Sequence, residues 1–497
     1  MSNTTTHRVT MKEWPLEELL AKRNAVLSRW PSGAALRDLE ESFAYRRTLP
    51  DTKNMPALIR RAESTGQSLV TPRAGVATVE EFTMLLQALE EAGADFLPAT
   101  IDSLSRHHRY AEVTALIEES KSKGRSMLNG TPIINWGVQA VRRFNEAVRE
   151  PILTYYAAFD GRFLAEMTLG GGLAGIVSSP MVDLLCYNRD DSVSELISNW
   201  QYVERLTALY EAQGFEIHRG MPSYPIGSVI PPSTSVVATC IDAMISASQG
   251  AKNVNLLTRH VGSALQDVAG IHAQERVARK YCALIGRADV KITSEFNQYV
   301  GEFPLDEAEA VALISAGAII GLLGGAVLIN VKTPDEGWGL PTVEGNVRGT
   351  KIVKFLAELF RNQRYPSSPE LDEEEAMIEE EACTMLDATL DLGDGDLAVG
   401  LPRALEAGVV DFPYSPARVV HGSCIAARDV TGAVRWVDPG QIPFSKKVRD
   451  FNRDQLAQRS LREGRDIGYE MALDDAEAGI RNVAGRDIAA SALQRVR

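Results

Sequence analysis

The chain has 497 residues, of which 45% are hydrophobic and 24% charged, a composition typical of a globular protein rather than a disordered one. Its formal net charge of −14 argues against a general binder of nucleic acid or of anionic membranes, because both need a basic face. A local cationic pocket for an anionic small molecule stays open.

The five cysteines lie far apart without a CxxC pair, so neither a disulfide framework nor a metal site is expected. This spacing fits a reducing cytoplasm, and segment 1–14 has no apolar stretch of the kind found in signal peptides. The longest apolar run, 310–329, is broken by glycines. It is predicted to be a buried helix leading into a buried strand, not a membrane span.

In chain order, residues 1–60 are predicted to form a helical arm, with charged helices at 12–29 and 34–47. From about residue 68, short apolar or β-branched segments alternate with amphipathic helical ones. The strand candidates are 68–71, 95–100, 126–129, 152–157, 175–178, 216–218, 253–257, 290–294 and 326–331. The helix candidates between and after them are 79–93, 110–124, 137–150, 161–169, 192–214, 235–250, 263–286, 306–324 and 343–361.

This alternation indicates parallel strands joined by crossover helices, either in an open doubly wound sheet or in a (β/α)8 barrel. Length and regularity favour the TIM-type barrel, over residues 61–365. The candidates outnumber the eight strands that a barrel needs, and 175–178 is the weakest of them. Past Pro366 the pattern becomes mixed and predicts a C-terminal α+β region over 366–497. Its acidic run, 372–381, is expected to be a solvated helix face.

Candidate binding residues follow the predicted first, second and last strands. In a barrel these loops share the rim at which chemistry takes place. Arg73, which lies between a proline and a glycine, can hold a carboxylate bidentately, Gly75 permits close approach by a ligand, and Arg106 lies on the loop after the second strand. Lys332 and Glu336, four residues apart, offer a cation and a carboxylate, the latter suited to the hydroxyls of a ribose. A surface salt bridge explains each of these residues alone, but their gathering on one rim indicates an anion-binding site.

Other motifs are weaker. The segment GGGLAG at 170–175 satisfies GxGxxG but does not clearly join a strand to a helix, so a tight turn is the better interpretation. The adjacent pair His107 and His108 lacks the spacing of metal ligands, and no GxSxG, HExxH or Walker A motif occurs in the sequence.

The same loops resemble the large (epsilon) subunit of glutamate mutase, also called methylaspartate mutase. The segments that carry the resemblance are PRAGVA at 72–77, GADFLP at 93–98, TID at 100–102, LNG at 128–130, WQY at 200–202, FPLDE at 303–307, VKTPDE at 331–336, PT at 341–342, GDLA at 395–398, EAGVVD at 406–411, PF at 443–444 and EGRD at 463–466. Because it covers nearly the whole chain at near-constant spacing, it is more specific than a likeness of fold.

The resemblance implies a barrel whose strand ends face adenosylcobalamin, in an isomerase that rearranges glutamate to 3-methylaspartate through radicals. It also implies a small partner subunit whose Asp-x-His-x-x-Gly motif binds the cofactor. No Asp-x-His occurs in this sequence, so the cobalt-ligating histidine is expected from that partner. A dimer of large subunits within a cytoplasmic heterotetramer and a small acid substrate belong to the same expectation.

Carried over by position, the resemblance implies two sets of contacts. The cofactor contacts are Gly75, Asn129, Phe303, Lys332, Glu336 and Leu340, with Lys332 and Glu336 at the ribose, while Cys186 falls where the family has proline. The substrate-side residues are Arg73, Arg106, Tyr155, Tyr156 and Tyr187.

The substrate side departs from the family pattern. Tyr155 and Tyr156 stand where the family has its third carboxylate-binding arginine and a histidine. Val177 falls at the position of a glutamate that meets the substrate's amino group, and Asp183 at that of a tyrosine. Losing charged partners at two places predicts an altered acid substrate, with Asp183 as a relocated partner for an ammonium group. The alternatives are a true glutamate mutase with rebuilt contacts, and a barrel that binds cobalamin or its partner without catalysis.

Overall fold

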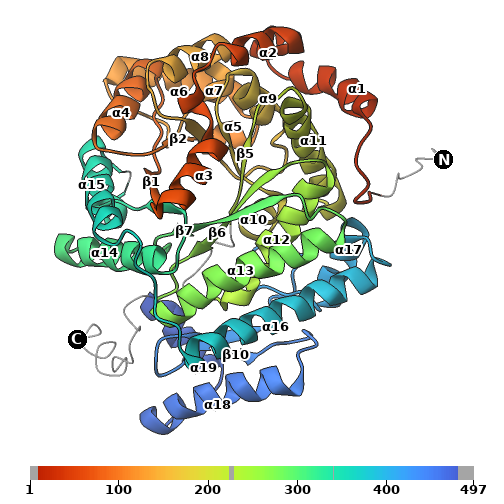
Figure 1. Cartoon of the computed structure of the whole chain (residues 1–497), viewed down its shortest axis with the longest axis vertical. Coiled ribbons are helices and arrows are strands. Elements are labelled where there is room, and N and C mark those ends of the chain that lie inside the picture. The colour runs from red at the N-terminus through yellow and green to blue at the C-terminus, as the bar shows by residue number, and fades with distance from the viewer. Residues whose placement is uncertain (1–8, 223–228, 340, 480–497) are drawn as a thin grey trace.

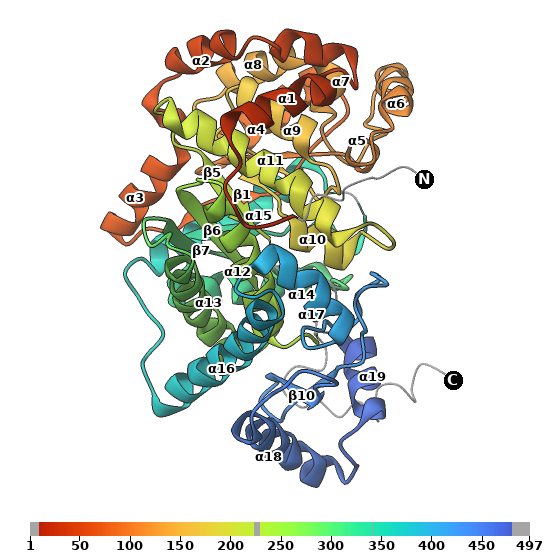
Figure 2. The ribbon, with the colours of Figure 1, turned by 90° about the vertical axis from the view of Figure 1, so that its right-hand side faces the viewer.

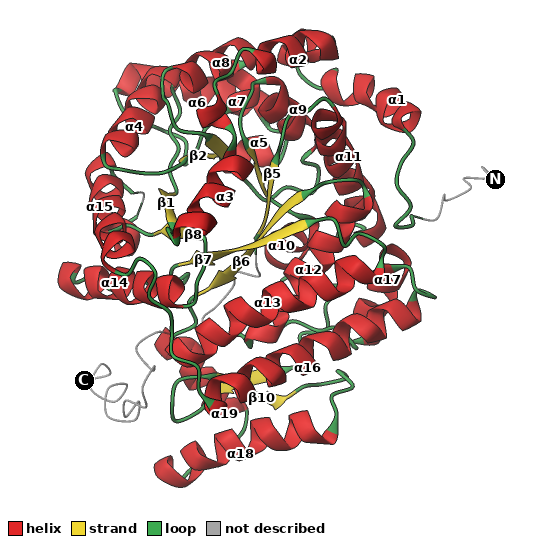
Figure 3. Cartoon of the chain, in the orientation of Figure 1, coloured by secondary structure: helices red, strands yellow, loops and turns green. Residues whose placement is uncertain are grey.

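The computed structural model describes residues 9–222, 229–339 and 341–479. Its main sheet has eight parallel strands in the order β1-β8-β7-β6-β5-β4-β3-β2. The strands are β1 (Leu69–Pro72), β2 (Leu97–Thr100), β3 (Ile152–Tyr155), β4 (Gly175–Val177), β5 (His218–Met221), β6 (Asn253–Arg259), β7 (Lys291–Asn297) and β8 (Leu328–Val331). Helices surround this sheet on all sides (Figures 1 and 3), so the predicted (β/α)8 barrel is confirmed.

Asp95 joins β1 to β2, the two strands at the ends of the sheet order. Its backbone N–H donates to the carbonyl of Val70 at 2.9 Å, and the Val70 N–H donates to its carboxylate at 2.9 Å. The Lys354 ammonium balances this carboxylate at 2.5 Å. One residue thus supplies a backbone and a side-chain hydrogen bond between the two strands.

The crossover helices begin where capping side chains precede apolar periodic segments. Thr78 accepts from Glu81 N–H at the start of α4, and Asp306 accepts from Ala308 N–H at the start of α14. The helices around the barrel are α4 (Val79–Glu91), α5 (Ser103–Arg106), α6 (Tyr110–Lys123), α7 (Ile133–Trp136), α8 (Val138–Glu146), α9 (Arg162–Gly170), α10 (Pro180–Cys186), α11 (Val193–Ala212), α12 (Pro232–Ser248), α13 (Ala264–Leu284), α14 (Glu307–Leu323) and α15 (Val343–Leu359).

The N-terminal residues pack against one side and one end of the barrel. They form α1 (Leu16–Leu27), η1 (Pro31–Leu36), α2 (Leu39–Arg47), η2 (Asp51–Lys53) and α3 (Met55–Thr65). The buried Arg23 guanidinium binds Glu166 of α9 at 2.9 Å and so holds α1 to the barrel. The helix α3, absent from the predicted elements, lies across the barrel opening in Figure 1. Its residues Met55 and Ile59 share an apolar cluster with Leu69 and Leu328 at the amino ends of the strands.

One of the nine strand predictions needs correction. Segment 126–129 is not a strand, because the Ser126 hydroxyl accepts from Ala77 N–H at 3.0 Å and donates to Leu128 O at 2.7 Å, which makes it a supporting loop. Segment 175–178, the weakest candidate, is β4. Gly175 is required there because a Cβ would lie 2.2 Å from the His218 carbonyl oxygen of the neighbouring strand.

The apolar run 310–329 forms most of α14 and continues into β8, as predicted, but the helix is only partly buried. Ala310, Ile314 and Ala318 face the core, whereas Ala312 and Ala316 are exposed. Among the described residues, no helix is long and apolar enough to cross a membrane.

The C-terminal residues form a separate layer beside α12 and α13, coloured from teal to blue in Figure 2. It comprises α16 (Pro369–Leu392), α17 (Leu397–Ala407), the antiparallel pair β9 (Ile425–Arg428) and β10 (Val434–Asp438), α18 (Lys446–Glu463) and α19 (Tyr469–Ala478). The acidic run is not simply a solvated face. Glu374 forms a buried ion pair with Arg435 at 2.7 Å, and Glu381 accepts from Trp436 and Asn452. The domain limits at residues 60 and 365 stay predictions.

Candidate functional site

Three loops meet at the carboxyl ends of β1 and β2. Thr100 N–H donates to Ala74 O at 3.1 Å, and both the N–H and the hydroxyl of Thr131 donate to Thr100 O at 2.7 Å. Gly75 lies inside this junction, where a Cβ would come within 2.6 Å of Thr100 O and 2.9 Å of the Gly130 Cα. Only glycine therefore fits at position 75, and Arg73, two residues earlier, is held at the rim.

Arg73 lies over the ring of Tyr155, with 4.7 Å between the guanidinium carbon and the ring centroid. The Nε of Arg73 and the hydroxyl of Tyr155 are buried, and neither has a hydrogen-bond partner among the described residues. Burial raises the pKa of Tyr155 well above its ordinary value, an effect that nearby Glu295 reinforces and Arg73 opposes. The phenol is therefore a neutral hydrogen-bonding group that can meet a ligand.

Arg106 ends the short helix α5, which begins with Asp102 accepting from Ser105 N–H at 2.8 Å. Its guanidinium donates to Ile101 O at 2.8 and 2.6 Å, which fixes the side chain against the loop after β2. Burial lowers the pKa of Arg106, and the Arg73 charge acts in the same direction, while the neighbouring Tyr187, Asp102 and Asp183 oppose them. The two arginines therefore belong to one electrostatic cluster, as the rim prediction requires.

Helix α10 faces Arg106 with Asp183 and Tyr187. Asp183 is buried and accepts from the Asn188 amide at 3.5 Å, and burial raises the pKa of its carboxyl to about 7. The ring of Tyr187 is 57% exposed, so it is open to solvent or to a ligand at the rim. Val177, at the end of β4, is buried and pairs in register with Tyr155, and it supplies no polar group.

Tyr156 is not brought together with the arginines. Adjacent strand residues point to opposite faces of a sheet, and Tyr156 faces the helix layer. Its ring stacks on Trp200 of α11, with 6.0 Å between centroids, and its hydroxyl donates to Gly161 O at 3.5 Å. The structure therefore gives Tyr156 a packing position rather than a place in the barrel interior.

The loops after β7 and β8 carry the residues predicted for a cofactor. Lys332 and Glu336 are ion-paired at 3.0 Å and partly exposed. Phe303 is buried at 5% exposure, and the two loops touch closely, since a Cβ on Gly337 would lie 2.6 Å from the Pro304 carbonyl oxygen. Leu340, the remaining predicted contact on this side, lies outside the described residues.

On the neighbouring rim, beside the Gly75 junction, Asn129 is exposed and accepts from Ser103 N–H at 3.4 Å. The predicted cofactor residues that the structure describes therefore all lie on loops at the carboxyl ends of strands.

The barrel interior contains a carboxyl group that the sequence analysis missed. Phe296 and Ile329 pack outward against α14, so Glu295 on β7 and Asn330 on β8 face the interior. Glu295 is fully buried and accepts from the Asn330 amide at 3.0 Å. Burial raises the pKa of Glu295 to about 7, against the opposing effects of Asn330 and of the Arg73 charge.

Several interior polar atoms lack a partner in the described part of the chain. They are Tyr155 Oη, His218 Nε2, Asn255 Oδ1, Glu295 Oε2 and Asn330 Oδ1. They come from five different strands, and water or a ligand must complete their hydrogen bonds.

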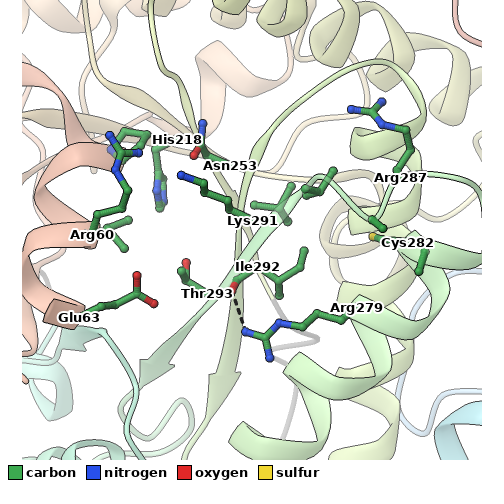
Figure 4. Close-up of a pocket in the computed structure, with 16 residues that line it drawn as sticks. Arg60, Glu63, His218, Asn253, Arg279, Cys282, Arg287, Lys291, Ile292 and Thr293 are labelled. Atoms are coloured by element: carbon green, nitrogen blue, oxygen red, sulfur yellow. Dashed lines mark hydrogen bonds between the residues drawn. The ribbon is translucent and has the colours of Figure 1, made fainter.

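A second hollow, of about 500 Å³, lies at the amino ends of β5, β6 and β7 between α3 and α13 (Figure 4). Its arginines already have acidic partners: Arg60 binds Glu216 at 2.7 Å and Arg279 binds Glu275 at 2.6 Å. It opens at the end of the barrel opposite to Arg73, because its lining residues lie at the amino ends of the strands and Arg73 follows the carboxyl end of β1. It is therefore not the site to which the rim residues belong.

The fold and the rim together define the class: a (β/α)8 barrel with two neighbouring arginines at the carboxyl ends of its strands, the end at which barrel enzymes carry their chemistry. The family model described as methylaspartate mutase E chain matches residues 49–485. The chain belongs to this family.

Curated relatives agree with the family. The chain is 42% identical to the glutamate mutase epsilon subunit of Desulfitobacterium hafniense over 464 residues, which cover 93% of this chain and 96% of that protein. It is 38% identical to the glutamate mutase epsilon subunit of Treponema denticola over 469 residues, covering 94% and 96% of the two chains. Identity to the corresponding subunit of Yersinia enterocolitica is 35% over 468 residues, covering 94% and 97%.

Proposed function

We propose that this chain is the large subunit of an adenosylcobalamin-dependent carbon-skeleton mutase, an isomerase, and that its substrate is an acid other than glutamate. The observation that carries the proposal is the family match over 49–485 combined with the paired Lys332 and Glu336 at the rim. A small cobalamin-binding subunit completes the enzyme, because this chain has no Asp-x-His segment to ligate cobalt. A cytoplasmic heterotetramer built on two large subunits belongs to the same proposal.

The rim residues fit the adenosyl half of the cofactor. The Glu336 carboxylate suits vicinal ribose hydroxyls, the Lys332 ammonium holds it in place at 3.0 Å, and Gly75 lets the loops after β1 and β2 pack closely at the same rim. Phe303 and Asn129 add an apolar surface and an exposed amide on the neighbouring loops. When bound, adenosylcobalamin supplies an organic radical by cleavage of its cobalt–carbon bond.

The chain's own residues bind the acid and keep water from it. Arg73 and Arg106 bind a carboxylate, and the narrow barrel interior below them excludes bulk solvent. Tyr155 supports Arg73 from beneath and offers its neutral hydroxyl to the substrate.

Tyr155, the residue over which Arg73 lies, supports a substrate other than glutamate. Tyr155 cannot form the charge-assisted pair that the resemblance assigns to a third arginine at this position, and a missing partner for a buried carboxylate costs about 2–5 kcal/mol. Val177 offers no carboxylate to an ammonium group. A dicarboxylate such as glutamate would therefore leave charges unpaired in this pocket.

Glutamate itself is the second candidate, and the names of the relatives favour it. Proteins 42% and 38% identical over nearly the whole chain are glutamate mutase epsilon subunits. In this case Tyr155 and Asp183 would have to replace the missing charged contacts.

Reconstitution tests both candidates. The chain is mixed anaerobically with its small subunit, adenosylcobalamin and a panel of acids, and the coupled cobalt(II)–organic radical signal is recorded by electron paramagnetic resonance. A signal with a monocarboxylic acid and none with glutamate is expected. A strong signal with glutamate alone would overturn the altered substrate, and no signal with any acid would overturn the mutase.

A further inference from the structure

Glu295 is a buried acid with half of its hydrogen-bonding capacity unused. Its Oε1 accepts from the Asn330 amide at 3.0 Å, whereas Oε2 has no partner, and no ion pair neutralises it in the part of the chain that the structure describes. An unpaired carboxylate at this depth is costly unless a ligand or water meets it.

The surroundings of Glu295 are those of the substrate site. The Arg73 charge lowers the pKa of Glu295, and the Glu295 charge raises the pKa of Tyr155. Arg73 also lies over Tyr155, with 4.7 Å between the guanidinium carbon and the ring centroid. Glu295 therefore lies below the carboxylate-binding rim, on the β7 wall of the barrel. A molecule whose carboxylate binds Arg73 would extend past Tyr155 toward the free oxygen of Glu295.

The residues of β4 that line the barrel cannot bind a polar group of the ligand as Glu295 on β7 can. Val177 pairs in register with Tyr155, and its side chain has only methyl groups to offer. These methyl carbons pack against Gly220 of β5, where an added Cβ would lie within 3.0 Å of them. Asp183 is the other acid near the arginines, but it lies beside Arg106 and already accepts from Asn188 at 3.5 Å. Glu295 is the acid whose free oxygen faces the interior.

We propose that Glu295 binds the ammonium group of the substrate, and hence that the substrate is an amino acid with a single carboxylate. This assignment rests on the proposed function, since it places the ammonium in the same site. The carboxylate pairs with Arg73 and Arg106 at the rim, and the ammonium is received between Glu295 and the Tyr155 hydroxyl. The single carboxylate follows from Tyr155, which offers no charge to a second carboxylate beside Arg73.

The test compares Glu295→Gln with Asp183→Asn in the full-length chain. Both changes remove a charge and keep the shape, and the amide oxygen that Glu295→Gln introduces still accepts from Asn330. The probes are butanoate, 2-aminobutanoate, 4-aminobutanoate, glutarate and glutamate, and their apparent dissociation constants are measured from shifts of the thermal unfolding midpoint.

In the unchanged chain, a monocarboxylic amino acid is expected to bind about tenfold or more tightly than butanoate. Glu295→Gln should abolish this preference and leave butanoate binding unchanged, which also shows that the pocket is intact. Asp183→Asn should keep the preference. Absence of any amino preference, its survival in Glu295→Gln, or its loss in Asp183→Asn would each overturn the assignment.

The same variants separate this assignment from the proposed function. In the complex with the small subunit and adenosylcobalamin, an amino preference that depends on Glu295 without any cobalt(II) signal would overturn the mutase and leave the ammonium site standing. A cobalt(II) signal whose amino preference survives in Glu295→Gln would overturn the ammonium site and leave the mutase standing.

Discussion

The guanidinium carbon of Arg73 lies 4.7 Å from the centroid of the Tyr155 ring, and in the described part of the chain neither Arg73 Nε nor the Tyr155 hydroxyl has a hydrogen-bond partner. A cation–π contact of this kind contributes about 0.5–2 kcal/mol, more when it is desolvated. The ring thus holds the arginine at the rim without neutralising its charge, and the charge stays available to an anion.

Replacing Tyr155 by Phe or by Leu separates the ring from the hydroxyl. Tyr155→Phe keeps the surface under Arg73 and removes a buried hydroxyl without a partner, so the free energy of unfolding should change by less than about 1 kcal/mol. Tyr155→Leu loses the contact and leaves a cavity, which should cost about 2–3 kcal/mol and weaken butanoate binding. Urea unfolding measures the free energy of unfolding, and thermal-shift titration measures butanoate binding. Equal losses in the two variants would contradict the role given to the ring.

Changing Lys332 to Met or Glu336 to Gln should weaken adenosylcobalamin binding about tenfold in the reconstituted complex, because the carboxylate or its orienting cation is lost. The substrate preference should not change. Lys354→Met is the matched control, since Lys354 and Asp95 form a pair of similar exposure at the amino ends of β1 and β2. It should lower stability and leave cofactor affinity within about twofold. Optical titration with adenosylcobalamin measures the affinity of each variant. If Lys354→Met weakened cofactor binding as much as the Lys332 and Glu336 changes, the loss would reflect general destabilisation.

The sequence predicted the barrel well because crossover helices and buried strands leave strong periodic signals. It placed a strand at 126–129 that does not form, and it ranked 175–178 as the weakest strand, both for local reasons. Segment 126–129 has the apolar residues of a strand but serves as a loop held by Ser126, whereas β4 is short and begins with a glycine that the neighbouring strand requires. Neither fact is visible in hydrophobic periodicity.

The candidate site was predictable at the rim and not in the interior. Arg73 and Arg106 follow predicted strands, and their approach follows from the barrel. Glu295 was missed because the predicted strand ended at 294, whereas β7 continues to Asn297. A strand carried three residues further would have placed Thr293, Glu295 and Asn297 on one face, a polar alternation unusual for a buried strand. Because adjacent side chains of a strand point to opposite faces, the opposite directions of Tyr155 and Tyr156 were predictable as well.

Glu295 gives a prediction for the pH dependence of stability. Its pKa is raised from 4.5 in the unfolded chain to about 7 in the folded protein, so the folded state holds a proton that the unfolded state loses between these values. The contribution is therefore fully present below pH 4.5 and is lost as the pH rises through about 7, with a size of about 3 kcal/mol. Glutamine does not titrate. The stability of Glu295→Gln relative to the unchanged chain should therefore rise by about this amount between pH 4.5 and 8 in urea unfolding. If the free energies of unfolding of the two proteins changed with pH in parallel, Glu295 would not be desolvated in the folded state.

The buried pair of Arg219 and Glu204 should matter far more for stability than the surface pair of Arg60 and Glu216. Arg219 on β5 donates to Glu204 of α11 at 2.8 Å and to the Ser178 carbonyl at 2.9 Å, and neither side chain of the pair is more than 1% exposed. Glu204→Gln would leave the guanidinium charge without compensation and should cost about 3–5 kcal/mol.

Glu216→Gln is the matched change at a pair whose side chains are 39% and 34% exposed, and there water replaces the lost partner at a cost of about 1 kcal/mol or less. Urea unfolding of both variants measures the difference. Because Arg219 also binds the carbonyl of Ser178, next to Val177, Glu204→Gln should loosen the β4 wall as well and weaken butanoate binding. A variant that lost stability without any change in butanoate affinity would show that the pair supports the barrel but does not shape the substrate site.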